Sequence, residues 1–363
     1  MKRYIKMKLK DQRGVTAVIV ALVAVILFSF AALAIDIGYS LVTKNELQNV
    51  ADAAALAAAR QLGANYSGID PENQSQYIVD PLELIAVAKD VALQNQAGGK
   101  FITINDGDGL TGDIVIGQWN ASTRTLTPGL SFPDAVRVIA RRDSSTVEGP
   151  ITTFFARIFG RDTVNVNAVA TAALSSIMIG KPSIPVGISK HRFETEYCDK
   201  PIVFYPTWDP ASCGGWHTFD DWPANANKLG NILDDLADET YDIPETIANV
   251  TQYVFIGGTL STSVFPEMYN LWNTMRTKND GEIDMDDDDN SWTTMVVVYD
   301  SNDCSNPSGW TTIVGFAVVK IDNVIGAPTN KIQATIQCDI ITSEVQGGGV
   351  YYGAKADTPN LVE

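Results

Sequence analysis

An uncharged run near the N-terminus constrains the fold more than any other feature of the sequence. It extends for 21 residues from Val15 to Ile35 (VTAVIVALVAVILFSFAALAI) and ends at Asp36. As an α-helix, such a run is about 31 Å long, which matches the hydrocarbon thickness of a bilayer. The sequence therefore predicts a transmembrane helix over residues 15–36.

Charge is distributed unevenly on the two sides of this run. Residues 1–14 contain six basic side chains and one acid, whereas the remaining residues include 20 basic and 42 acidic ones. Basic residues that flank a membrane span stay on the cytoplasmic side, so we expect a basic cytoplasmic tail at residues 1–14 and export of everything beyond Asp36. The net charge of −22 beyond the tail argues against nucleic acid, and against anionic lipid as the main partner.

Two kinds of N-terminal processing remain as alternatives to an uncleaved anchor. A signal peptide has the same polarity, and Ala32-Leu33-Ala34 has the pattern of a cleavage site, but signal peptides have a shorter apolar core of about 7–15 residues. A prepilin-type leader would be cut after Gly14, and the fifth mature residue would then be Ile19, where pilins usually have glutamate. The length of the run favours the uncleaved anchor.

The helical pattern continues beyond the membrane over residues 37–63. No proline occurs before Pro71, and small or apolar residues recur at helical spacing, so we expect an outward alanine-rich helix that ends at Gly63. One face is a stripe of small side chains, which lets another surface approach closely. That surface is either the chain's own exported domain or a partner. The stripe consists of Ala51, Ala54, Ala55 and Ala58.

The exported body divides by composition into two units. Residues 64–180 contain short runs rich in Val, Ile and Thr, which predict a mostly-β domain. Proline and glycine cluster in KPSIPVG (181–187), and residues 181–363 then mix strand-like and helix-like runs. Helices are expected near residues 225–238, 243–252 and 264–276. The predicted fold class is α+β: a long transmembrane helix extended outside the membrane, a mostly-β unit, and a mixed α/β unit braced by disulfides.

All the cysteines lie in the second half of the chain, and none forms the CxxC pair typical of a zinc site. Outside the cytoplasm, an even number of cysteines predicts disulfides, here two. The residues are Cys198, Cys213, Cys304 and Cys338. Three connectivities are open, and proximity in the sequence favours Cys198–Cys213 and Cys304–Cys338.

Strings in the N-terminal region resemble a known family. RGVTAVIVAL (13–22) opens the apolar run, AIDIGY (34–39) closes it, and LQNVADAAALAAAR (47–60) follows on the outward helix. Their order and spacing resemble the N-terminal region of TadG-like (TadE/TadG) proteins, which are associated with Flp-type tight-adherence pili. Four later segments are similar to the ectodomains of these proteins: GDIVIGQW (112–119), PDAVRVIARR (133–142), FFARIFG (154–160) and AVATAAL (168–174).

The resemblance implies a non-enzymatic, membrane-anchored component of Tad/Flp-type pilus assembly or secretion machinery, acting through protein–protein interaction. Its partners would be other pilus or secretion-system proteins or a second copy. Its location would be the bacterial inner membrane, single-pass, with a cytoplasmic N-terminus and a periplasmic or extracellular C-terminal domain. Many TadG proteins also contain a von Willebrand A-like domain with an Asp-x-Ser-x-Ser metal motif, from which the nearest string here, DSNDCS (300–305), departs. The alternative function is an envelope-anchored adhesin or ligand-binding module.

The local signatures of several common enzyme classes are missing from the sequence, including GxSxG, HExxH and the Walker A pattern. His217 lies close to Cys213 and Asp220 in CGGWHTFDDW (213–222), as a base beside a nucleophile does. An exported cysteine is more often in a disulfide, however. We therefore expect no catalytic residues and no enzyme.

Two acidic segments have the oxygen-rich composition of calcium loops. In NDGDGLTGD (105–113), carboxylates alternate with glycines, which suits either a hard cation or a turn leading into a strand. DMDDDD (284–289) is either a cation site or a loop that stays solvated because its charges repel one another. The candidate calcium ligands are Asp106, Asp108, Asp113, Asp286 and Asp288, and no other cofactor is expected.

Overall fold

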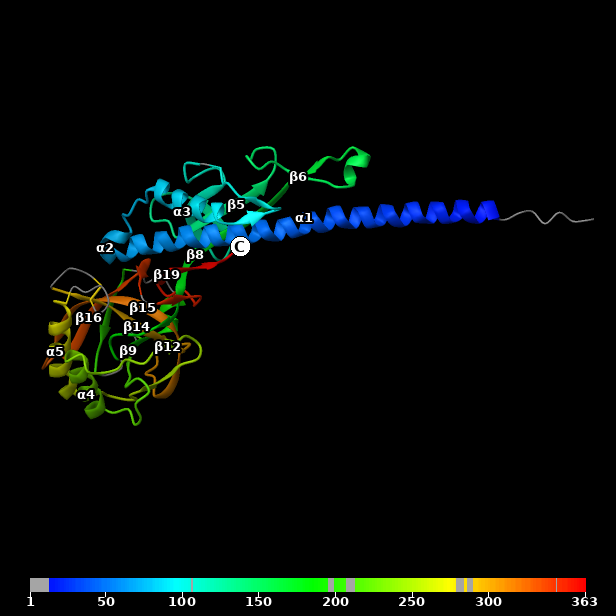
Figure 1. The fold of residues 1–363 in the computed structure, drawn as a ribbon. Coiled ribbons are helices and arrows are strands. Elements are labelled where there is room, and N and C mark those ends of the chain that lie inside the picture. The colour runs from blue at the N-terminus through cyan, green and yellow to red at the C-terminus, as the bar shows by residue number, and fades with distance from the viewer. Residues whose placement is uncertain are drawn as a thin grey trace, which may run out of the picture.

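In the computed structural model, one long helix runs into a body of two β-rich lobes (Figure 1). The first lobe surrounds the C-terminal half of the helix, and the second lies at the end of the helix that is far from the N-terminus (Figure 1). The structure describes residues 13–105, 107–194, 199–206, 213–278, 284–285, 290–343 and 345–363.

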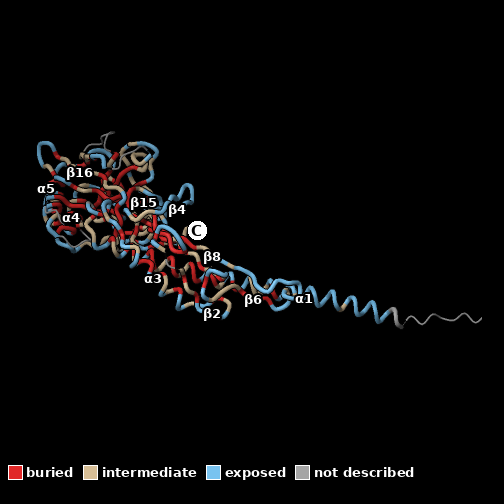
Figure 2. Tube along the Cα trace, turned by 90° about the horizontal axis from the view of Figure 1, so that it is seen from above, coloured by how far each residue is buried: buried red, intermediate tan, exposed pale blue. Residues whose placement is uncertain are grey.

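Helix α1 (Arg13–Ser67) is unbroken for 55 residues. Its first part is exposed on all sides, with Phe28 and Phe30 at 75% and 67%, whereas its second part has a buried face (Figure 2). The helix is long and apolar enough to cross a membrane, and large apolar side chains that face outward are stable in lipid. The expected end at Gly63 is wrong, because the helix continues for one more turn.

The first lobe is built on a mostly antiparallel sheet, which has eight strands over the described residues. Its main path runs in the order β17-β19-β8-β5-β3-β4, and two short strands pair with the end of β8. The strands are β3 (Ile114–Asn120), β4 (Thr125–Pro128), β5 (Ala135–Arg142), β8 (Val166–Gly180), β12 (Thr246–Ile247), β17 (Ile340–Thr342), β18 (Gln346–Gly347) and β19 (Ala354–Leu361).

The second part of α1 packs on β8, β19 and β5 of this sheet, and α3 (Pro81–Leu93) packs on α1. Small side chains on the strand allow this: Ala168, Ala170 and Ala172 of β8 are buried in one core with the helix. The short elements of the lobe are α2 (Pro71–Gln74), the pair β1 (Gln96–Ala97) and β2 (Lys100–Phe101), the pair β6 (Ile151–Thr152) and β7 (Thr163–Val164), and the 3₁₀ helix η1 (Ala156–Phe159).

In the part of the second lobe that the structure describes, the sheet has seven strands, and two helices pack on each other. Its path is β10-β16-β15-β14-β9-β11, with β13 paired to β15, and among the described strands of this sheet only the β9–β14 pair is parallel. The helices expected near 225–238 and 264–276 are present, but 243–252 forms no helix and contains β12. The elements are β9 (Val186–Ser189), η2 (Lys190–Glu194), β10 (Pro201–Phe204), β11 (Gly214–Trp216), α4 (Ala226–Ala237), β13 (Gln252–Phe255), η3 (Thr262–Val264), α5 (Phe265–Met275), β14 (Trp292–Tyr299), β15 (Gly309–Ile325) and β16 (Lys331–Gln337).

The end of the chain returns to the first lobe. Lys355 of β19 forms an ion pair with Asp134 at 2.9 Å, so the last long strand is tied to the start of β5. The buried side chain of Gln74 exchanges two hydrogen bonds with the backbone of Ile341 in β17. The expected second unit at residues 181–363 is corrected accordingly, because residues from Ile340 onward complete the first sheet.

Gly63 shows how closely the helix and the returning strand approach each other. A Cβ atom at this position would lie 1.9 Å from the carbonyl oxygen of Asp357 in β19, so only a glycine fits. At Gly38, in the same helix, a Cβ atom would meet nothing within 4 Å. The contact with β19 therefore depends on Gly63.

We expect Gly63→Ala to destabilise the first lobe by about 1–3 kcal/mol, because a methyl group against backbone forces the strand away. Alanine is the better helix former by about 1 kcal/mol, so the effect opposes intrinsic propensity. Gly38→Ala is the matched control and should be neutral or slightly stabilising. Urea unfolding of the detergent-solubilised chain measures both, and equal stability of the two variants would contradict the close approach.

Candidate functional site

The clearest cluster of polar contacts lies on α1 directly after its uncharged run. Asp36 is 8% exposed, and its carboxylate accepts three backbone N–H groups from the loop between β6 and β7. The donors are Phe154 at 2.7 Å, Phe155 at 3.0 Å and Ala156 at 2.6 Å. A carboxylate that satisfies successive N–H groups at the start of a helical turn acts as a cap for that turn. Asp36 thus attaches this loop to the helix.

A second loop is attached by two further side chains on the same helix. The Tyr39 hydroxyl donates a hydrogen bond to the Gly98 carbonyl at 3.2 Å, and the Gly98 N–H donates to the Glu46 carboxylate at 2.7 Å. The Tyr39 ring also packs edge-on against Phe154 at 5.5 Å between centroids. We call Asp36, Tyr39 and Glu46, with the two hairpins β1–β2 and β6–β7, the exit clasp.

Sequence reasoning singled out the strings that contain Asp36 and Phe154 but did not connect them. The two residues are separated by 118 positions, and neither string alone indicates a contact. The signal in the sequence that could have indicated this contact is chemical. A lone acid at the edge of an uncharged helix needs donors, and a loop that begins a helical turn provides N–H groups.

The alanine stripe is buried inside the molecule. Ala51, Ala54, Ala55 and Ala58 are each 0% exposed and belong to the core of the first lobe. The stripe was expected to pack either on the chain's own domain or on a partner, and in the structure it packs on the chain's own domain. The stripe is therefore not a free surface for a partner, and its assignment as an interaction site is corrected.

The disulfide pairing expected from proximity is wrong. Cys213 is bonded to Cys304, 91 residues away, and Cys338 is also disulfide-bonded. The partners meet because the sheet places β11, β9 and β14 side by side, with Cys213 before β11 and Cys304 after β14. Cys198 lies outside the described residues.

His217 is a core residue of the second lobe. Its ring is fully buried, stacks on Tyr253 at 4.8 Å between centroids, and accepts a hydrogen bond from the Phe219 N–H at 3.1 Å. Burial lowers the pKa of His217 to about 3, because the charged ring would lose its hydration. Since Cys213 is in a disulfide, the Cys–His pair considered as a nucleophile and base has no free thiol.

Of the candidate calcium ligands, the structure describes Asp108 and Asp113. Asp108 accepts the N–H groups of Leu110 and Thr111 at 2.9 and 2.7 Å, as in an ordinary turn. Burial raises the pKa of Asp113, and its ion-pair partner Arg141 opposes this. Within the described ranges, His, Cys, Asp and Glu side chains form no group of three that could hold a metal ion. Asp106, Asp286 and Asp288 lie outside those ranges, and calcium there stays a prediction.

An apolar helix that becomes the core helix of an acidic, β-rich body fits a membrane-anchored envelope protein. Comparison with protein families gives a more specific result. Residues 14–61 match the family described as putative Flp pilus-assembly TadE/G-like, and residues 42–172 match the family described as putative Tad-like Flp pilus-assembly. These two matches, which together span residues 14–172, confirm the resemblance to TadE/TadG-like proteins. No curated protein and no solved structure is significantly similar to it.

The first prediction of this site concerns the exit clasp. We expect Asp36→Asn to raise the rate of amide hydrogen exchange in residues 151–164 roughly tenfold or more, because hydrogen bonds to a charged acceptor are among the strongest in proteins. Asp52→Asn is the control, since Asp52 lies on the same helix and accepts from Gln48 rather than from the loop. Mass spectrometry on the solubilised chain measures the exchange of residues 151–164 in each variant. Exchange that stays unchanged in both variants would show that the clasp does not hold the loop.

The second prediction tests whether His217 is structural. Because its pKa is about 3 when folded and about 6.5 when unfolded, the unfolded state binds more protons between these values. Stability of the second lobe should therefore fall as pH drops below 6.5, by up to about 1.4 kcal/mol per pH unit from this residue. His217→Asn should remove that part of the slope. Urea titrations followed by tryptophan fluorescence report on this lobe, which lies in the half with six of the seven tryptophans. Equal slopes would contradict a buried neutral ring.

Proposed function

We propose that the protein is a non-enzymatic, membrane-anchored scaffold of Tad/Flp-type pilus assembly or of its secretion machinery, acting by binding other proteins. The observation that carries the proposal is that one helix is both the apolar anchor and the core helix of the lobe that matches the family. The basic residues before the helix support a cytoplasmic N-terminus in the bacterial inner membrane, with the lobes on the other side.

The geometry supports a role in positioning. From Asp36 to Ser67, α1 covers 32 residues, which corresponds to about 48 Å of helix. The second lobe lies at this outer end (Figure 1). Because the helix is embedded in the first lobe, it cannot bend freely between the membrane and the second lobe. The scaffold would therefore hold the second lobe at a fixed height above the membrane, where it meets its protein partners.

The second lobe is the part that we assign to partner binding. It lies outside residues 14–172, which match the family models, and it has its own core. A shared first lobe with a distinct second lobe suits a component that is common to many such machineries but contacts partners of its own. The partners would be other pilus or secretion-system proteins, or a second copy.

The proposal predicts that anchoring is required for function. In the host bacterium without its own copy, a chain whose residues 1–35 are replaced by a cleavable signal peptide should yield a folded, released body and no assembled pili. A chain whose residues 15–35 are replaced by an unrelated uncharged span of equal length, with Asp36 retained, should restore them. Sheared surface pili and chain levels are measured by immunoblot. Pili restored by the released body would contradict an anchored scaffold, and normal pili with lost attachment to surfaces would favour an adhesin.

A further inference from the structure

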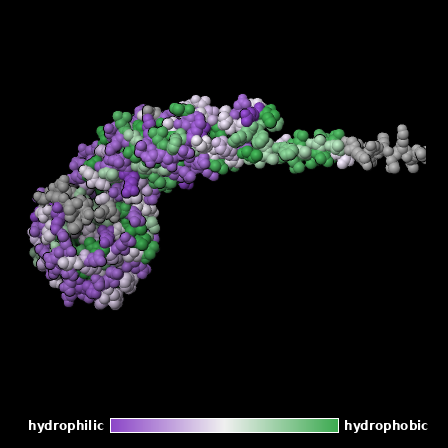
Figure 3. Space-filling model, viewed as in Figure 1, coloured by the Kyte–Doolittle hydropathy of each residue, from purple (hydrophilic) through white to green (hydrophobic). Residues whose placement is uncertain are grey.

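The hairpin β6–η1–β7 presents an apolar tip to the outside. We call residues 151–164 the finger. It extends beyond the rest of the first lobe, alongside α1 and toward the N-terminal end of the helix (Figure 1). Ile158 and Phe159 are 76% and 79% exposed, and Phe154 is 49% exposed. Figure 3 shows hydrophobic surface both on the finger and along the protruding helix. Apolar residues clustered in this way on an exposed turn mark a binding surface.

The exit clasp fixes the height of the finger along α1. Asp36 holds the start of η1 at the residue where the uncharged run ends. A groove of about 640 Å³ between helix and finger is lined on the helix side from Leu33 to Leu41, and on the finger side by residues that include Ala156 and Val164. Leu33 lies three residues inside the run, about 4.5 Å deeper than Asp36. The finger therefore lies at the outer boundary of the hydrocarbon core.

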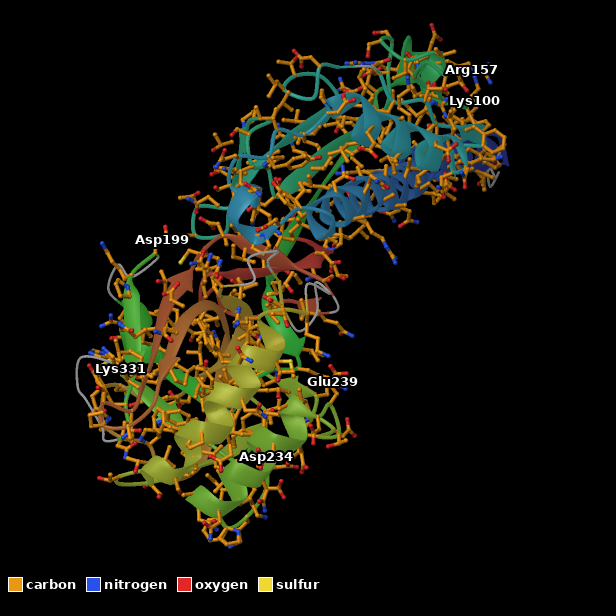
Figure 4. All side chains as sticks on the ribbon, turned by 90° about the vertical axis from the view of Figure 1, so that its left-hand side faces the viewer. Lys100, Arg157, Asp199, Asp234, Glu239 and Lys331 are labelled. Atoms are coloured by element: carbon orange, nitrogen blue, oxygen red, sulfur yellow. A yellow bond between two sulfur atoms is a disulfide. The ribbon has the colours of Figure 1, made fainter. Side chains whose placement is uncertain are left out.

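The charged groups of the finger suit the same boundary. Arg157 and Arg161 flank the apolar turn, and Asp162 is its single acid. The Arg157 guanidinium donates to the Phe154 carbonyl at 2.9 Å, which keeps it beside the aromatic rings. Figure 4 shows Arg157 and Lys100 at one end of the first lobe, away from Asp234, Glu239 and Lys331 on the second lobe. Aromatic rings with arginines at their edge are typical of the headgroup region of a bilayer.

We propose that the finger is a second membrane contact, which inserts Ile158 and Phe159 into the outer part of the non-cytoplasmic phospholipid leaflet beside α1. Lipid is the occupant because the groove beside the finger is lined by Leu33, Ile37 and Leu41, which belong to the exposed apolar surface of the anchor helix. The acidic charge of the body does not oppose this contact, because the finger itself has a local excess of basic residues. Anchor and finger together fix the orientation of the body relative to the membrane. The proposal rests on the anchor assigned under the proposed function.

Site-specific fluorescence in vesicles tests it. Full-length chains with Phe159→Cys, Val25→Cys or Ile78→Cys are labelled with NBD without reductant, and the unsubstituted chain gives the background. Ile78 is 69% exposed and lies on the first lobe away from the clasp, so it is the matched control. The chains are reconstituted in phosphatidylcholine–phosphatidylglycerol vesicles that contain doxyl-labelled lipids. We expect the Phe159 label to lose most of its emission to a shallow quencher, the Val25 label to a deep one, and the Ile78 label to neither.

The outcomes separate this proposal from the function on which it rests. A quenched Val25 label with an unquenched Phe159 label would overturn the finger and leave the anchor. If neither label is quenched, the anchor fails as well. A blue-shifted Phe159 label without lipid quenching would show that protein covers the finger, and would also overturn the proposal. The double variant Ile158→Asp/Phe159→Asp should fold and stay in the membrane, since both side chains are exposed. A Phe155→Cys label should be quenched by the shallow quencher in the chain without these two substitutions, and should lose that quenching in the double variant.

Discussion

Along the C-terminal half of α1, the alanines at 51, 54, 55 and 58 share one core with Ala168, Ala170 and Ala172 of β8. Small side chains on both surfaces let the helix lie close to the sheet, close enough for Gly63 to contact the backbone of β19. Because the same helix continues as the exposed apolar run, this packing fixes the direction of that run relative to the whole first lobe. A flexible linker at the same place would have left the body free to rotate.

The exit clasp extends this rigidity to the end of the apolar run at Asp36. Three N–H groups bound to Asp36, and the Gly98 backbone held by Tyr39 and Glu46, attach both hairpins to the segment of α1 between the apolar run and the core. A bare helix between membrane and body could fray or bend there. With the hairpins attached, its backbone is supported on the side of the body, and the finger is held at a fixed height along α1, beside the end of the apolar run.

How much of this architecture the sequence predicts depends on the range of the contacts. The apolar run, the outward helix and the strands around Val115 and Val138 follow from local periodicity, and the structure has them. The alanine stripe indicated close packing but not its partner, because small residues serve an internal and an external contact equally well. The Cys213–Cys304 bond and the Asp36 contacts join residues 91 and 118 or more positions apart. Only the assembled sheet and loops bring such residues together.

The return of the chain to the first lobe changes how the two lobes are coupled. Residues between β8 and β17 form most of the second lobe, which is thus inserted into the first rather than added after it. Strand β8 passes through both cores: Leu174 is buried in the first and Ile177 in the second. Short strands from the second half of the chain pair with the end of β8 around Ile179. A load applied to the second lobe therefore reaches α1 through a continuous hydrogen-bonded strand, and under the proposed function this strand would connect a bound partner mechanically to the anchor.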